Sequence, residues 1–157
     1  MAQRVTPYQS GINYWLLVAD PDDYSYADLE RNTAAVWNRV KDYASLKHLR
    51  DVDSDEEVLF FHGGTELAIV GIVRVTSDPY PDPQGSSEDE WVLDISPERR
   101  LESPVSLAEI ENLPEFQDLD FLGNPDLTFS PVTPEIWNRV QELSQAALAY
   151  STQENQE

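Results

Sequence analysis

Apolar and polar residues along the chain first predict a set of short strands. Residues 13–18 form an aromatic and aliphatic run that stops at an Asp-Pro pair, which is typical of a buried strand ended by a turn. Two β-rich runs, 58–62 and 67–75, flank a pair of glycines, and this pattern predicts a hairpin. Gly71, inside the second run, indicates a bulge or a close approach of another group to the backbone.

Capping motifs predict three helices. In residues 25–28 and 106–109 a serine is followed three positions later by an acidic residue, which is the spacing of a capping box at the start of a helix. Thr133 and Pro134 supply an N-cap and a first-turn proline. Apolar residues then recur at helical spacing over 136–147, so we expect an amphipathic C-terminal helix.

The stretches between these elements have weaker patterns. Residues 37–50 mix aromatic, basic and small residues, which predicts a loop that enters a short helix. We expect 51–57 to be a solvated acidic turn, 91–95 to be a strand, and 127–129 to be the last short strand. Residues 116–121 are expected to form a partly ordered connection.

The order of these elements predicts one α+β domain. Strands and helices interleave without regular βαβ spacing and without repeats, which favours a mostly antiparallel, curved sheet. The length of 157 residues fits a single domain, which we expect over 1–150, with a disordered tail over 151–157. The N-terminus lacks an apolar signal core and no run approaches transmembrane length, so we expect a cytoplasmic protein.

Charge is the most unusual bulk property. Thirty acidic residues face ten basic ones, which gives a formal net charge of −20. Such a chain could bind cationic partners, be disordered, or work in a salt-rich cytosol. Four tryptophans and seven tyrosines argue for a packed core rather than disorder. Because the Debye length is only about 3 Å in 1 M salt, excess carboxylates hardly repel one another there. We therefore favour a halophilic source, in which the charge reports on the solvent.

The basic residues are unevenly spread. Half of all lysines and arginines lie within residues 31–50, namely Arg31, Arg39, Lys41, Lys47 and Arg50. They could simply pair with neighbouring carboxylates, or they could form a basic patch where an anionic ligand approaches. The sequence leaves both interpretations open.

Sequence motifs for enzymatic chemistry are absent. The chain has no cysteine, no glycine-rich phosphate loop and no nucleophile elbow, and two histidines are too few for a typical zinc site. Aspartates alternate over 51–55 as in a calcium loop, but Glu56 and His62 stand where glycine and glutamate belong. We therefore expect no metal and no cofactor. Among thirty acidic residues a catalytic carboxylate pair cannot be recognised by pattern.

Aromatic side chains are more informative. Trp15, Trp37, Tyr43, Tyr80 and Trp91 lie near predicted strand ends or in loops rather than at core periodicity. They could be half-buried packing at the rim of the core. Alternatively, they could form a cage in which a planar base stacks, with about 1–3 kcal/mol gained per stacked base.

The ordered series of local segments resembles the EVE domain family from about residue 13 to 143. The matching segments are Tyr14-Trp15-Leu16, Trp37-x-x-Val40-x-x-Tyr43, Leu49-Arg50, Phe60-Phe61-His62, Ile69-Val-Gly-Ile72, Trp91-Val92 and Pro131-Val-Thr-Pro134. The resemblance implies a PUA-like fold, a curved and partly closed β-barrel surrounded by short helices. It also implies a non-enzymatic module that binds nucleic acid, DNA or RNA, and recognises a modified base in an aromatic-lined pocket.

Carried over by position, the resemblance implies a set of ligand-binding residues. They are Trp15, Trp37, Arg39, Val40, Lys41, Asp42, Tyr43, His62 and Thr128. The chain departs from the family where Val18 and Ala19 replace a usual Lys-Ser pair, and where Asp42 and Ala44 replace Asn and Gln. The aromatic platform is kept while the polar groups that read base edges change, so the identity of the base stays open.

Two other functions compete with a reader of modified bases. One is a nuclease or base hydrolase that uses carboxylates with a divalent ion. The other is a small-molecule or protein interaction domain that has lost nucleic-acid binding, which the replacements at Val18, Ala19 and Ala44 favour.

Overall fold

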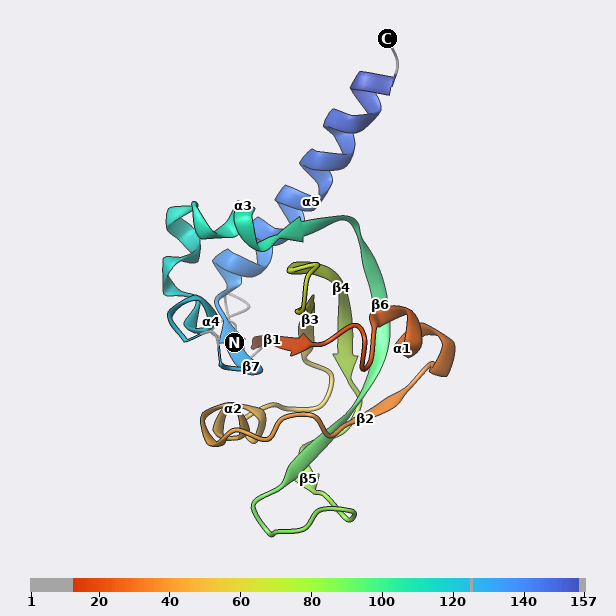
Figure 1. Cartoon of the computed structure of the whole chain (residues 1–157), viewed down its shortest axis with the longest axis vertical. Helices are drawn as coiled ribbons and strands as arrows, with labels where there is room; N and C mark the ends of the chain where they lie inside the picture. The colour runs from red at the N-terminus through yellow and green to blue at the C-terminus, as the bar shows by residue number, and fades with distance from the viewer. Residues whose placement is uncertain (1–12, 125, 156–157) are drawn as a thin grey trace, which may run out of the picture.

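The computed structural model describes residues 13–124 and 126–155, in which short helices surround a curled, seven-stranded sheet (Figure 1). The strand order is β2-β6-β4-β3-β1-β7, and β5 pairs with β6. Only the β1–β3 pair is parallel within these residues, and the other pairs are antiparallel. The strands are β1 (Tyr14–Ala19), β2 (Ala35–Trp37), β3 (Glu57–His62), β4 (Ala68–Val75), β5 (Tyr80–Pro81), β6 (Trp91–Ser106) and β7 (Phe129–Val132).

The helices cover the two faces of the sheet. They are α1 (Tyr26–Asn32), α2 (Tyr43–Leu49), α3 (Leu107–Glu111), the 3-10 helix η1 (Pro114–Asp118), α4 (Asp120–Gly123) and α5 (Pro134–Asn155). In the view of Figure 1, α3 lies next to the C-terminal end of β6, α5 begins beside β7, and α2 lies below β1 and β7.

Strand residues alternate between two apolar cores. Trp15 and Leu17 of β1 point to a core that α1 and α2 cover, whereas Leu16 points to a core that α3, η1, α4 and α5 cover. In β3, Phe60 belongs to the first core and Phe61 to the second. This alternation follows from the period of two along a strand and explains why the buried runs in the sequence are nearly continuous.

Several local predictions are confirmed. Ser25 and Ser106 each form a reciprocal capping box, and the hydroxyl of Thr133 accepts a hydrogen bond from the backbone N–H of Ile136 at 3.1 Å. The β3–β4 hairpin forms, with register shifts on both sides of β4. At Gly71 a Cβ atom would lie 2.6 Å from the ring of Tyr26, so a close approach does require glycine there.

Other boundaries differ from the prediction. Residue 37, expected to begin a loop, instead ends strand β2 (Ala35–Trp37), which is too short to show a period. Strand β6 continues to Ser106 because a register shift accommodates Pro97, which normally argues against a strand. The last strand begins at Phe129 rather than at 127, and Pro131 is tolerated there because β7 is an edge strand.

Two stretches are more ordered than expected. Residues 114–123 form η1 and α4 instead of a partly ordered connection. Within the acidic turn, Glu56 is only 6% exposed, so the prediction of a solvated turn is wrong at this residue. Its Oε1 accepts hydrogen bonds from the Trp15 indole N–H and the Asp53 backbone N–H, both at 2.9 Å, and these donors offset the cost of burying the carboxylate.

Candidate functional site

A network of hydrogen bonds fixes the start of α2 against strands β1 and β7. Asp42 is the N-cap of α2, and its carboxylate accepts bonds of 3.0 Å from the Ser45 backbone N–H and from the Thr128 hydroxyl. The buried Ser45 hydroxyl accepts bonds from the backbone N–H groups of Thr128 and Phe129. The Thr128 carbonyl in turn accepts from the backbone N–H of Val18 at 3.0 Å. The structure thus brings together Asp42 and Thr128, two of the residues that the sequence predicts to bind the ligand.

The same network sets the protonation of Asp42. Burial by itself raises the pKa of this carboxyl, but hydrogen bonds from the side chain and backbone of Ser45 and from Thr128 outweigh it, so the pKa is lowered. Asp42 is thus an anion that uses both oxygens to hold α2. The pattern of the sequence did not single out Ser45, because a buried serine has no signature of its own.

The solvent face of α2 carries one aromatic ring and two cations. Tyr43 and Lys47 follow one another at i and i+4, which places them on one side of the helix, and Arg50 is the C-cap at the end of the helix. The Tyr43 side chain is 78% exposed, and the Lys47 ammonium lies 5.8 Å from its ring centroid. Arg50 stacks over Trp91 at 4.5 Å. We call these three residues the α2 stripe.

The α2 stripe differs from the other basic residues in its pairing. In the described part of the chain, every other lysine and arginine lies within 4.0 Å of a carboxylate, as in the pairs Arg39–Asp23, Lys41–Glu90 and Arg100–Glu30. Lys47 and Arg50 have no such partner there. In a chain with a net charge of −20, two cations without a paired carboxylate stand out.

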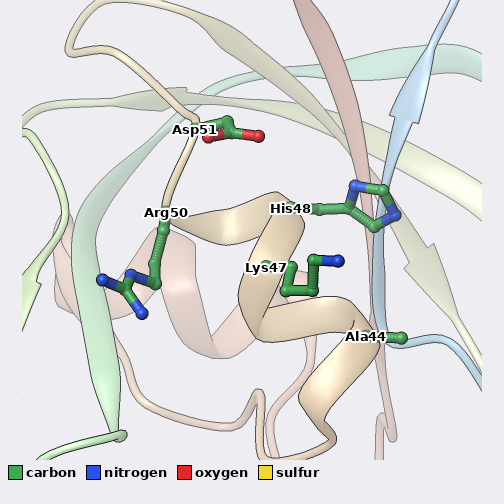
Figure 2. Close-up of a pocket in the computed structure, with 5 residues that line it drawn as sticks. All are labelled: Ala44, Lys47, His48, Arg50 and Asp51. Atoms are coloured by element: carbon green, nitrogen blue, oxygen red, sulfur yellow. The ribbon is translucent and has the colours of Figure 1, made fainter.

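An open groove of about 570 Å³ borders the α2 stripe (Figure 2). It is lined by Ala44, Lys47, His48, Arg50 and Asp51. Figure 2 shows Arg50 pointing away from Lys47 and His48, so cations reach both sides of the helix end. A second groove of about 540 Å³ shares Ala44 and His48 and extends to α4.

The two predicted tryptophans lie inside the protein. Trp15 is 5% exposed and Trp37 is fully buried, and both belong to the core beneath α1 and α2. Trp37 packs against Phe60, with ring centroids 5.7 Å apart. Trp15, Trp37 and the exposed Tyr43 therefore do not share one open pocket in this structure.

The remaining predicted residues surround this core. Val40 is buried, and Lys41 is exposed with its ammonium 3.8 Å from Glu90. The Arg39 guanidinium lies over the rings of Tyr24 and Trp37, and its Nε donates to Asp23 at 2.7 Å. Tyr24 is a neighbour of Trp37 that the sequence pattern did not single out.

His62 holds helix α1 in place. Its Nε2 accepts a hydrogen bond of 3.0 Å from the backbone N–H of Tyr26, the first residue of α1, and its Nδ1 lies 2.8 Å from a Glu66 carboxylate oxygen. This arrangement corresponds to the neutral tautomer with the proton on Nδ1. His62 is 7% exposed, and both ring nitrogens are engaged.

Comparison with known proteins places this fold. The chain is 22% identical over 168 residues to thymocyte nuclear protein 1 of Rattus norvegicus, covering 85% of this chain and 74% of the relative. The solved structure of Rpa0253 from Rhodopseudomonas palustris has a TM-score of 0.80 and 25% identity, covering 86% of this chain and 94% of that one. Human THYN1, crystallised with DNA containing 5-methylcytosine, has a TM-score of 0.78 and 20% identity, covering 84% and 97%.

The solved neighbours have the PUA-like architecture that the sequence led us to expect, a curled sheet that forms a partial barrel. Across the described residues, no helix is both long and apolar enough to cross a membrane. The sequence model of the EVE domain matches residues 13–143, which is most of the chain. The protein belongs to the EVE domain family.

Proposed function

We propose that the protein is a non-enzymatic module that binds DNA or RNA and recognises a modified base, with the α2 stripe as its contact with the nucleic acid. The pairing of charges carries this proposal. Where every other lysine and arginine of the described residues lies beside a carboxylate, Lys47 next to the exposed Tyr43 ring and Arg50 at the end of α2 stay available for phosphates. The similarity to human THYN1, which was crystallised with 5-methylcytosine DNA, supports the same ligand class.

The Tyr43 ring can contact a base, whereas the two cations contact only phosphates. Phosphate contacts with Lys47 and Arg50 position the backbone but carry no sequence information. An aromatic ring that is 78% exposed offers a face on which any base can stack. Stacking is not screened by salt, so it maintains binding where phosphate contacts weaken.

We also propose that the protein works in the salt-rich cytoplasm of a halophile. Two lysines and thirty acidic residues support this, because a coat of carboxylates is tolerated when the Debye length is short. Counterion release contributes little to binding in such a solvent. Recognition then depends mainly on stacking and on contacts with base edges.

No specific observation favours a metal-dependent nuclease or hydrolase. Among the side chains that the structure describes, no group of three or more His, Asp or Glu is arranged to hold a metal ion. Val18, Ala19 and Ala44 stand where the family usually has polar residues. These replacements favour an altered base preference as readily as a loss of binding.

Fluorescence anisotropy with labelled oligonucleotides tests the proposal. Matched strands with and without a single 5-methylcytosine are titrated in molar KCl and in dilute buffer. We expect preferential binding of the modified strand at both salt concentrations. Tyr43→Ala should weaken binding by about 5- to 150-fold at high salt, which corresponds to the loss of one stacked base.

Charge variants complete this test. Lys47→Gln and Arg50→Gln should weaken binding of modified and unmodified strands equally and mainly in dilute buffer. Arg31→Gln is the matched control, since this exposed arginine lies on α1, where it pairs with Asp28 of the same helix. Absence of oligonucleotide binding at every salt concentration would overturn the proposal, and equal effects of Arg31→Gln and Arg50→Gln would remove the α2 stripe from it.

A further inference from the structure

The second groove, between α2 and α4, combines apolar and polar side chains. Leu119 and Leu127 line it and are only 2% and 5% exposed. The polar part of its lining includes Gln117, Asp120 and Asn124. Its volume of about 540 Å³ lies within the range of about 300–1,000 Å³ that is usual for ligand pockets. A ligand with an apolar body and polar edges matches this lining.

The polar groups of this groove have unused hydrogen-bonding capacity among the described residues. The Asp120 carboxylate accepts no hydrogen bond there, and the Nε2 atom of His48 lies 4.0 Å from it, which is too long for one. The Gln117 amide donates to two backbone carbonyls at 3.3 Å, which leaves its oxygen as an acceptor. The Asn124 oxygen accepts from the Asp126 backbone N–H, which leaves its NH₂ group as a donor.

Ala44 and His48 connect the second groove to the α2 stripe. Both residues also line the first groove together with Lys47, and Figure 2 shows their side chains on the same side of α2. Residues three or four positions apart on a helix are neighbours, so Lys47 lies beside Ala44. The EVE family usually has glutamine where Ala44 stands, and the short alanine leaves the junction of the two grooves unfilled. A strand that is held at the α2 stripe can therefore continue into the second groove.

We propose that the second groove is a subsite for a guanine that lies next to the modified base in the bound strand. The Watson–Crick edge of guanine carries two adjacent donors, N1–H and the 2-amino group, beside the acceptor O6. Asp120 accepts from both donors, and Asn124 donates to O6. The apolar side chains of Leu119 and Leu127 contact the ring. This inference rests on the proposed function and names the sequence context that the protein selects.

Other occupants match the groove less completely. Adenine, cytosine and thymine each carry a single donor group on the same edge, so they leave part of the Asp120 carboxylate without a partner. A guanidinium from a basic peptide has donors only, so it cannot accept from Asn124, and it would meet the like charge of Lys47 at the junction. Guanine is therefore the ligand whose donors and acceptors fit this lining.

Matched oligonucleotides test the subsite. Each strand carries one 5-methylcytosine, and the base beside it, on either side in turn, is guanine, adenine or hypoxanthine, which is guanine without the 2-amino group. Fluorescence anisotropy in molar KCl emphasises base contacts, because phosphate contacts are weakened there. We expect guanine on one of the two sides to strengthen binding about fivefold over adenine, the lower end of what a bidentate contact discriminates. Hypoxanthine should keep only part of this preference.

Two variants of the groove determine whether the preference comes from it. Asp120→Asn should abolish the preference for guanine over hypoxanthine, because one acceptor becomes a donor. Ala44→Gln should abolish it by filling the junction, and glutamine is well tolerated at an exposed helix position. Glu111→Gln is the matched control, since this exposed residue of α3 lies outside the lining of the groove and changes the net charge as Asp120→Asn does. It should leave the preference unchanged.

A free nucleotide provides a measurement that needs no oligonucleotide. The side-chain amide signal of Asn124 is followed in a proton–nitrogen correlation spectrum of the full chain and is assigned from Asn124→Ala. We expect this signal to move on titration with 2′-deoxyguanosine 5′-monophosphate and to stay fixed with the corresponding adenosine nucleotide. A signal that responds equally to both nucleotides, or to neither, would contradict the subsite.

The outcomes separate the subsite from the proposed function. Equal binding of guanine and adenine strands overturns the subsite, as does a guanine preference that survives Asp120→Asn. If Tyr43→Ala still weakens binding of these strands, the proposed function stands without the subsite. If the Asn124 signal responds to the guanine nucleotide while no oligonucleotide binds at any salt concentration, the proposed function is wrong and the groove binds guanine nucleotides alone.

Discussion

The two aromatic regions on either side of residue 40 are built in opposite ways. Trp37 closes strand β2 and is fully buried, whereas Tyr43 opens helix α2 and is 78% exposed. Arg39 beside Trp37 is neutralised by Asp23, while Lys47 beside Tyr43 is unpaired within the described residues. The comparison teaches that aromatic composition alone does not locate a binding surface. A binding surface also needs a ring that is exposed and a neighbouring cation that no carboxylate neutralises.

The buried region should be the most sensitive to substitution, and Glu56→Ala should have the largest effect. It removes the acceptor for the Trp15 indole N–H and for the Asp53 N–H, both then buried or partly buried without a partner. We expect a loss of about 3 kcal/mol in the free energy of unfolding, measured by chemical denaturation. Glu56→Gln should cost less because one acceptor oxygen remains, and Glu88→Ala in the exposed loop should change little. Equal stability of Glu56→Ala and Glu88→Ala would show that Glu56 does not stabilise this core.

Gly71→Ala probes the other wall of the same core. The new Cβ would lie 2.6 Å from the Tyr26 ring, which is fully buried and whose hydroxyl donates to the Ile72 carbonyl at 2.7 Å. We expect a loss of about 2 kcal/mol from overpacking. In a Tyr26→Leu background the same substitution should cost less, since the clashing ring is gone. Additive losses in the double variant would contradict this contact.

A smaller effect is expected where the two regions meet, at Asp42. Asp42→Ala removes the N-cap of α2 and should cost about 1 kcal/mol at neutral pH. Because folding lowers the pKa of Asp42 below its usual value of 3.8, its contribution is complete above that value and is lost as the pH falls through the lower, folded value. Urea denaturation of the wild-type protein and of Asp42→Ala from pH 7 downward should therefore show a difference in the free energy of unfolding that is constant at first and becomes smaller in acid. A difference in the free energy of unfolding that becomes larger in acid would mean that folding raises the pKa of Asp42.

The smallest effect on stability is expected on the exposed side. Tyr43→Ser should change the free energy of unfolding by less than about 0.5 kcal/mol, because the ring makes few contacts. Thermal unfolding measures this directly. A loss comparable to that of Gly71→Ala would show that Tyr43 is part of the core packing and would end the contrast between the two regions.

Much of the fold follows from local signals. Capping boxes, the glycine-centred hairpin and Gly71 are set by residues a few positions apart, and these were predictable. Strand β2 and the second half of β6 were not, because they are strands through pairing with distant partners rather than through their own pattern. Residues 96–104 include two prolines and several exposed charges, and only the neighbouring β4 makes them a strand.

The candidate site was predictable in content but not in arrangement. The sequence showed that half of the lysines and arginines lie between 31 and 50, together with Trp37 and Tyr43. It could not show which cations find a carboxylate, because partners such as Glu90 and Glu30 come from other elements. Nor could it show that Trp37 faces inward while Tyr43 faces outward, since both depend on how β2 and α2 dock. The predicted ligand-binding roles of these residues stay predictions.

Strand β1 lies between β3 and β7, so the first strand of the sheet takes one neighbour from the middle of the chain and the other from near its end. During synthesis, a nascent chain therefore carries β1 with one edge open until residue 132 has left the ribosome, which takes roughly ten seconds at ordinary translation rates. An open strand edge is a template for pairing with other chains. The nascent chain is thus more prone to pair with other chains than the folded protein is.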